Sequence, residues 1–449
     1  MIVRAALVLL LAGPATAQDW STHRGGPARA GSVDGRPGPS APKVLWTFRS
    51  KEQFLAPLSA VDARLLAVSL GAFNTGSVRA MEAADGRVAW GRGAPDVKLP
   101  TVGTPAAAAG TMYFGEGMHQ TNGSSLHALR VSDGRTLWRL DVPGELVHIE
   151  ASPTVADGRV FVGAGSGGVL CVDASRLTLE GRAVSAGEAA AVLDAKWKAM
   201  VDAYEVDKKK DPDFAIPPNE AALPKPSPAI AWEKGKGAWH VDAPLLVAAG
   251  KVYAASSYLD KEKLGERALV CLNAADGAEL WKTPLKYNAW GGATLAGDRL
   301  VVTCSSMRYD PKELPGARGE VLCLKLDGAV EWRREYDRAV LSTAVAAGDV
   351  VVICDTAGEV HALEAASGKP RWSRKTGAPY FGGAAVAGGA VYAVDLDGKA
   401  HALSLSDGAV RWTLDLGAEA KAPGMVYGGP IVHGGRLFVA TTTLEGASA

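Results

Sequence analysis

The sequence has no excess of one charge sign, few aromatic residues and, beyond its N-terminus, no long apolar run. Its 48 basic and 48 acidic residues cancel, which excludes the charge excess of nucleic-acid-binding and polybasic membrane-surface proteins. Aromatic residues make up only 7% and charged residues 21%, against 47% apolar residues. This is an ordinary globular composition and argues against general disorder. Beyond the N-terminus, no run of residues is apolar enough to span a membrane.

Cysteine is scarce, and its spacing excludes several chemistries. There are five cysteines, an odd number with no close spacing, which is a poor disulfide framework. The sequence contains no CxxC, no CxxCH for covalent haem and no adjacent pair. A nucleophile elbow, zinc-finger spacing and a phosphate-binding loop followed by a helix are also missing. The cysteines are Cys171, Cys271, Cys304, Cys323 and Cys354.

The N-terminus has the pattern of a secretory signal. Arg4 precedes the apolar stretch 5–12, which is too short to cross a bilayer, and Ala15-Thr16-Ala17 resembles a cleavage site. We therefore expect residues 1–17 to be a cleaved signal peptide and the protein to be secreted or periplasmic. No cysteine follows the apolar stretch, so the lipobox of a bacterial lipoprotein is missing.

Glycine is abundant, with 53 residues, and most of it belongs to a repeated phrase. A short apolar strand, an Asp/Ser-Gly turn and a Trp-bearing strand recur, as in VRAMEAADGRVAW (78–90) and AHALSLSDGAVRW (401–412). Asp-Gly between short alternating runs is a strong hairpin signal. A second hairpin of small residues and a VYV-like strand precedes each phrase, as in 384–398. Each repeat therefore predicts four antiparallel strands, A to D, with the tryptophan on D.

The tryptophan spacing predicts the architecture. Most intervals between the repeat tryptophans are 40–51 residues, the period of a β-propeller blade. We predict an all-β, eight-bladed propeller, or a degenerate seven-bladed one, over residues 43–449, and packing between blades for every repeat tryptophan. These are Trp46, Trp90, Trp138, Trp232, Trp281, Trp332, Trp372 and Trp412.

One interval is twice as long and indicates an insertion in the third blade, over residues 175–228. Ser185 and Glu188 have capping-box spacing, and apolar residues up to Tyr204 follow at helical intervals. Six prolines then predict an extended return path to the D strand around Trp232.

The chain ends should meet. Seven C strands but eight Trp-bearing strands are visible, and the eighth A and B strands lie near 426–433 and 436–441. The spare D strand, Lys43–Phe48, should therefore pair into the last blade, after an N-terminal extension over 18–42. The eighth blade still lacks a recognisable C strand. A closed ring without open edges is expected to be a monomer.

The phrases resemble the pyrroloquinoline-quinone-type (PQQ-like) β-propeller repeat, over nearly the whole mature chain and including Asp19-Trp20 and Arg24-Gly25-Gly26. The resemblance implies the fold but leaves function open, because the family holds both enzymes and scaffolds. Quinoprotein dehydrogenases of this family bind PQQ and Ca²⁺ and carry an adjacent cysteine pair, which this chain lacks. The propeller subunit of the outer-membrane assembly machinery is a scaffold without a cofactor.

Candidate site residues lie on the loops from each D strand to the next A strand. These loops open on one face of a propeller, beside the B–C loops. His148/Glu150 and His240/Asp242 are each i, i+2 pairs on neighbouring blades, so each pair shares a strand face. They could ligate a metal, but hydrogen bonding around the channel rim is the favoured interpretation. The predicted mouth comprises His148, Glu150, Trp239, His240, Asp242, Trp290, Tyr380, Phe381 and Tyr427.

Two other sets are interpreted as structural. His127, His361 and His401 occupy one repeat register, on exposed or inter-blade faces of separate blades, so a shared catalytic role is not expected. Cys171, Cys271 and Cys323 take the register held elsewhere by alanine and are predicted to be small core residues.

The sequence thus favours an exported, non-enzymatic propeller that acts as a protein-interaction scaffold or ligand-binding module. We expect a protein partner or a small organic ligand, no nucleic acid, no metal and no cofactor. The alternative is a PQQ-dependent oxidoreductase with an atypical site.

Overall fold

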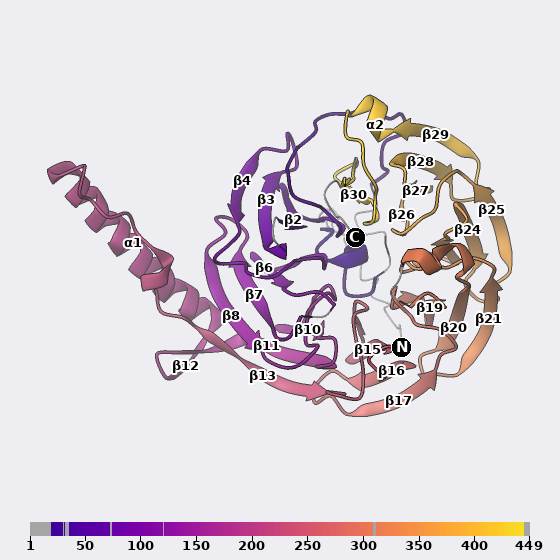
Figure 1. Ribbon diagram of the computed structural model, residues 1–449, viewed down its shortest axis with the longest axis horizontal. Helices are drawn as coiled ribbons and strands as arrows, with labels where there is room; N and C mark the ends of the chain where they lie inside the picture. The colour runs from indigo at the N-terminus through magenta and orange to yellow at the C-terminus, as the bar shows by residue number, and fades with distance from the viewer. Residues whose placement is uncertain are drawn as a thin grey trace, which may run out of the picture.

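Short antiparallel strands dominate the computed structural model, which describes residues 19–29, 31, 36–71, 74–119, 121–308 and 311–443. They form separate sheets arranged around a common centre (Figure 1). Among these residues there are eight sheets: six of four strands, one of five and one of two. The predicted all-β propeller class is confirmed, whereas the number of blades stays a prediction because the last sheet is incomplete.

We number the sheets 1 to 8 along the chain. Sheets 1 and 2 contain β1 (Ser59–Val61), β2 (Arg64–Leu70), β3 (Gly76–Glu82) and β4 (Val88–Arg92), then β5 (Ala106–Ala108), β6 (Thr111–Gly115), β7 (Ser124–Arg130) and β8 (Thr136–Val142). Sheet 3 contains β9 (Thr154–Ala156), β10 (Arg159–Gly163), β11 (Val169–Leu179), β12 (Arg182–Ser185) and β13 (Ser227–Lys234). Sheets 4 and 5 contain β14 (Leu246–Ala248), β15 (Lys251–Leu259), β16 (Leu264–Asn273) and β17 (Glu279–Pro284), then β18 (Ala293–Ala296), β19 (Arg299–Ser305), β20 (Gly319–Lys325) and β21 (Val330–Tyr336). Sheets 6 to 8 contain β22 (Val345–Ala347), β23 (Val350–Cys354), β24 (Glu359–Glu364) and β25 (Pro370–Lys375), then β26 (Ala385–Ala387), β27 (Ala390–Val394), β28 (Lys399–Ser404) and β29 (Val410–Asp415), then β30 (Ile431–His433) and β31 (Arg436–Phe438). The helices are η1 (His23–Gly25), α1 (Ala186–Lys210), η3 (Glu220–Ala222), η4 (Pro311–Gly316) and α2 (Leu416–Glu419).

The repeated Asp-Gly turn and the repeated tryptophan are packed against each other across neighbouring sheets. Gly277 has φ +73°, and a Cβ there would lie 2.6 Å from a ring carbon of Trp232 in the preceding sheet. The Trp232 indole N–H donates to the Ala274 carbonyl of the same turn at 3.1 Å. The same contact recurs at Trp46/Gly86, Trp90/Gly134, Trp281/Gly328, Trp332/Gly368 and Trp372/Gly408. The predicted inter-blade packing is therefore confirmed for these tryptophans and for Trp232.

This packing predicts that Gly277→Ala destabilises the protein more than Gly250→Ala. Both glycines have a left-handed backbone conformation, with φ +73° and +71°. An alanine at either position therefore adds about 1–2 kcal/mol of backbone strain. Only at Gly277 does the new methyl group meet a ring, since no atom of the described residues lies within 4 Å of a Cβ at Gly250. We expect Gly277→Ala to lose about 1–3 kcal/mol more in urea unfolding. Equal losses would contradict the role assigned to the indole contact.

An insertion leaves the ring in sheet 3. Strand β11 runs beyond the other C strands and pairs with β12, a hairpin that the sequence did not reveal. Helix α1 begins after Ser185 with the expected capping box to Glu188 and projects from the ring (Figure 1). Its base is held by the side chains of Arg130 and Arg135, which pair with Asp194 at 2.6 and 2.9 Å.

Sheet 8 is incomplete. Among the described residues, strand β31 pairs with β30 only. Residues 43–48 form no strand, so their predicted D strand is wrong. Trp46 nevertheless occupies the expected register, because its indole N–H donates to the Ala83 carbonyl of sheet 1 at 3.2 Å. No described residue fills the C position between β31 and residues 43–48.

The N-terminal plug, which we define as the described residues 19–31, crosses the centre of the ring. Its backbone bonds to the innermost strands of sheets 1, 2, 4, 5 and 7. The partners are Ala60, Ala107, Val247, Leu295 and Val386, at 2.7–3.1 Å. In addition, the Thr22 hydroxyl donates to the Pro153 carbonyl at 2.8 Å, next to sheet 3. The segment was predicted only as part of an N-terminal extension. In the structure, the plug links the sheets from inside the ring.

The two residue sets interpreted as structural are buried. The five cysteines are buried and unpaired, which confirms the core interpretation of Cys171, Cys271 and Cys323. His127, His361 and His401 each bond a carboxylate at the end of the adjacent B strand, at 2.8, 3.1 and 3.4 Å. Recurrence in three sheets marks this pair as a feature of the repeat. In the described residues, no helix is long and apolar enough to cross a membrane.

Candidate functional site

The central channel holds a cavity of about 180 Å³ at the predicted mouth. The plug reaches this cavity with His23 and Arg24. Five of the nine predicted mouth residues line it, and they come from loops that precede A strands. These five are Glu150, Asp242, Trp290, Phe381 and Tyr427.

The two predicted i, i+2 pairs converge on one carboxylate. The Asp242 oxygens lie 3.0 Å from His148 Nε2 and 2.7 Å from His240 Nε2. Both imidazoles are fully buried, and their ring centroids are 5.3 Å apart. Sequence alone could not establish this convergence, which depends on how far each loop extends before its A strand.

A third imidazole completes what we call the histidine cluster: His119, His148 and His240. His119 lies on the loop after β6, and one ring nitrogen from each histidine lies within 4.8 Å of the others. The His119 ring is 6.1 Å from the His148 ring and 6.2 Å from the His240 ring. His119 is not among the predicted mouth residues, because the prediction rested on the D–A loops alone. The B–C loops, which share the same face, were the available signal.

Local backbone contacts fix the cluster. A Cβ at Gly117 or at Gly265 would lie 3.0 Å from the Cβ of His148 or His240, respectively. Both glycines have positive φ, +90° and +86°, so they permit this close approach. The His119 backbone N–H donates to the Glu150 carboxylate.

Electrostatics in the cluster favour an ionised carboxylate. Burial alone would raise the pKa of Asp242, but the charge of His240 and the hydrogen bonds from both imidazoles lower it well below its usual value. Burial opposes the charged form of His148 as well, but the hydrogen bond to Asp242 and the charges of Asp242 and Glu150 together outweigh burial and raise the pKa of His148. Burial lowers the pKa of His119. The site thus combines one anionic side chain with imidazoles of unequal basicity.

The aromatic residues predicted at the mouth divide into two groups. Phe381 and Tyr427 pack edge to face at 5.4 Å and line the cavity with Trp290. Trp239 is buried under Gly235 and donates to Glu266 at 2.7 Å. Tyr380 is 1% exposed, and its hydroxyl bonds Thr376. The structure therefore does not bring Trp239 and Tyr380 to the cavity, because both side chains pack inside or between sheets.

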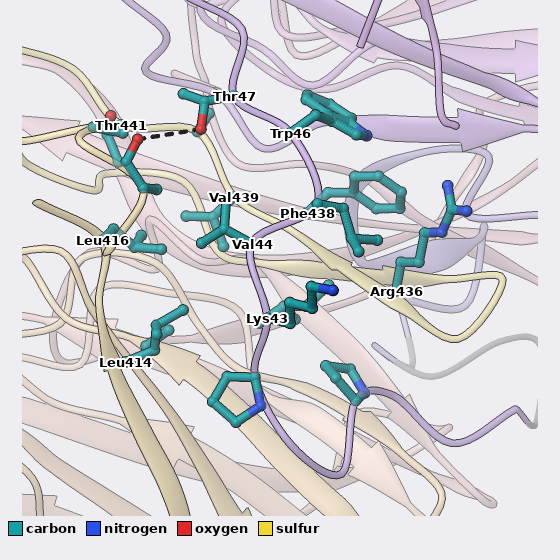
Figure 2. A pocket seen from close by; sticks show the side chains of 18 of the residues that line it. Lys43, Val44, Trp46, Thr47, Leu414, Leu416, Arg436, Phe438, Val439 and Thr441 are labelled. Carbon is teal, nitrogen blue, oxygen red and sulfur yellow. Dashed lines mark hydrogen bonds between the residues drawn. The ribbon is translucent and has the colours of Figure 1, made fainter. Parts of the chain in front are cut away.

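A second and larger cavity, of about 350 Å³, lies in sheet 8 at its empty C position. We call it the sheet 8 groove. Val44 and Trp46 form one wall and the chain's C-terminal residues Phe438 and Val439 another (Figure 2). Leu414 of sheet 7 also lines it, and Lys43 and Arg436 bring positive charge to it.

Comparisons with known proteins agree with this fold. The family model of the outer membrane protein assembly factor BamB matches residues 10–209 and 317–448. BamB from Moraxella catarrhalis is 15% identical, with a TM-score of 0.57 over 88% of this chain and 94% of its own. The computationally designed Ika8 protein is 11% identical, with a TM-score of 0.59 over 89% and 96%. A quinohemoprotein alcohol dehydrogenase from Comamonas testosteroni is 12% identical, with a TM-score of 0.52 over 85% and 78%. These structural likenesses concern the fold alone. No curated protein sequence matches the chain.

Proposed function

Because the chain belongs to the family of the outer membrane protein assembly factor BamB, we propose that it is a protein-interaction scaffold of the cell envelope. The signal peptide expected over residues 1–17 supports a periplasmic or secreted location. The observation that carries the proposal is the sheet 8 groove, where an extended segment of another protein would complete the sheet.

The groove has the features of an acceptor for a strand. On one side, β31 is paired only with β30 among the described residues, so its outer edge is open for hydrogen bonding. On the other side, Trp46 already stands where a D-strand tryptophan stands in the other sheets. Every other sheet has a C strand between these two positions. Main-chain pairing at such an edge gives affinity, and pockets for alternate side chains give specificity.

The walls indicate the chemistry of the occupant. Val44, Trp46 and Phe48 are partly buried and alternate with exposed residues, and Leu437 and Val439 continue the apolar lining. A fitting segment therefore places small residues at alternate positions, as Ala400 and Ala402 do in β28. Unfolded strands of outer-membrane β-barrels share this alternation. We therefore propose such an extended polypeptide as the partner.

A peptide of this chain's own C-strand sequence, residues 399–405 (KAHALSL), is the probe for the groove. We expect it to bind the purified protein saturably, with a dissociation constant in the micromolar range by calorimetry. The same peptide with Ala402 replaced by Pro should not bind, because proline removes a ladder donor. Val439→Arg should weaken binding at least 10-fold by filling the groove. The matched control, Val330→Arg on the outer strand β21, should leave binding unchanged.

Two results would overturn this partner. Binding that is equal in the parent and in Val439→Arg would show that the peptide does not use the groove. Binding that appears only after deletion of residues 444–449 would assign the groove to the chain's own C-terminal segment.

The alternative, a PQQ-dependent oxidoreductase, does not fit the channel. The plug crosses the centre of the ring. Arg29 in the plug donates hydrogen bonds to the carbonyls of Leu245 and His23 and to the Thr154 hydroxyl. The remaining cavity of about 180 Å³ is small beside the 300–1,000 Å³ common for organic ligands. The five cysteines are buried and not adjacent, so they offer no disulfide over a quinone. Saturable binding of PQQ with Ca²⁺, together with dye-linked alcohol oxidation, would reverse this choice.

A further inference from the structure

The histidine cluster has a geometry that goes beyond a scaffold. Three loops, after β6, before β9 and before β14, each contribute one imidazole, and the loops come from sheets 2, 3 and 4. We propose that His119, His148 and His240 bind one divalent transition metal ion, with Asp242 positioning two of the rings. This departs from the metal-free, hydrogen-bonded rim that the sequence favoured.

The separation of the donor atoms suits a single ion. Imidazole nitrogens bind zinc at about 2.0–2.1 Å, so two ligands of one ion lie at most about 4.2 Å apart. The three ring nitrogens here lie within 4.8 Å of one another. Small side-chain rotations can shorten these separations to those between the ligands of one ion. Three imidazoles favour zinc, copper, nickel or cobalt over magnesium or calcium, which prefer oxygen ligands. A three-histidine site also leaves a fourth position open.

The position of Asp242 matches that of a carboxylate behind metal-binding histidines. It accepts from Nε2 of His148 and of His240, at 3.0 and 2.7 Å, which fixes the ring orientation as such carboxylates do. The other nitrogen of His240, Nδ1, is buried without a hydrogen-bond partner in the described structure. Buried polar atoms rarely lack partners, and a metal ion would satisfy this one.

The surrounding charge also suits a dication. The Asp242 carboxylate is 6% exposed and pairs only with imidazoles among the described residues. Glu262 lies 3.4 Å from His119 Nε2. Because imidazole ligands bind a metal in the neutral form, these carboxylates would balance the charge of the ion. Asp242 also lines the channel cavity, so the ion would lie at its edge.

A second cluster, Asp355, Glu359 and His361, meets the same distance criterion but has a structural explanation. Its His361–Asp355 pair recurs as His401–Asp395 in sheet 7 and as His127–Glu116 in sheet 2. The repeat therefore accounts for it. The histidine cluster has no such counterpart among the described sheets, which makes His401 a suitable control for the test.

The test is zinc and cobalt titration of untagged protein stripped with a chelator. We expect one equivalent of Zn²⁺ by calorimetry, and a visible Co²⁺ spectrum of low-coordinate type that Zn²⁺ abolishes. His148→Ala, His240→Ala and the loop variant His119→Gln should each weaken Zn²⁺ binding at least 100-fold. Asp242→Asn should weaken it about 10–100-fold, as loss of an outer carboxylate does. His401→Ala, which removes a buried histidine paired with aspartate elsewhere, should leave binding unchanged.

Circular dichroism and urea unfolding of each variant separate lost binding from lost folding. His119 lies on a partly exposed loop, so its variant should fold as the parent does. Substoichiometric Zn²⁺ in the parent, or Zn²⁺ affinity in His119→Gln and His240→Ala equal to that of the parent, would overturn the proposed site. The peptide assay of the groove is independent of metal, so either proposal can fail alone.

Discussion

Deletion of residues 18–50 should abolish cooperative folding or lower the melting temperature by more than about 10 °C. The deletion removes the plug, which bonds the innermost strands of sheets 1, 2, 4, 5 and 7, and it removes Trp46 from its place against Gly86. Each buried backbone group left without a partner costs about 1–3 kcal/mol. Thermal unfolding by circular dichroism measures the effect.

Restoration in trans is the control for this deletion. If the plug acts through its contacts, a synthetic peptide of residues 18–50 added during refolding should raise the melting temperature of the truncated protein. The same peptide with Arg24 and Arg29 replaced by Ala should restore less. A truncated protein that melts within about 2 °C of the parent would contradict the central role of the plug.

The fold was largely predictable because one local pattern repeats. The Asp-Gly turn and the tryptophan are close in sequence, and their contact with the next sheet repeats with the same register. The prediction failed where pairing depends on a missing neighbour. Residues 43–48 have the alternation of a strand, but without a C strand beside them they have no ladder to join.

The plug was missed for a different reason. Residues 19–31 show no strand or helix period, because their partners are backbone groups of short strands distributed from Ala60 to Val386. Such contacts depend on ring closure, which no local pattern encodes. The candidate site shows the same limit. His148, His240 and Asp242 were selected from their loops, whereas Trp239 and Tyr380 were misplaced, because loop sequence does not say whether an aromatic ring turns outward or into the core.

Arg29→Met should be the most damaging single substitution in the plug. The Arg29 side chain is fully buried, and its donors reach the carbonyls of Leu245 and His23 at 2.8–3.0 Å as well as the Thr154 hydroxyl. Methionine fills much of the same volume but satisfies none of these acceptors. The His23 carbonyl would lose its partner, whereas the Leu245 carbonyl keeps the Thr154 hydroxyl at 2.8 Å. One orphaned carbonyl predicts a loss of about 1–3 kcal/mol in urea unfolding.

The matched control for that substitution is Arg87→Met. Arg87 is 67% exposed and pairs with Glu82 at 3.2 Å, and an exposed pair of this kind contributes about 0–1 kcal/mol. Arg29→Lys should fall between the two variants, because one ammonium group can reach some but not all of the acceptors that the planar guanidinium serves. If Arg29→Met unfolds at the same urea concentration as Arg87→Met, the buried guanidinium of Arg29 has no stabilising role, and the plug is held by its other contacts.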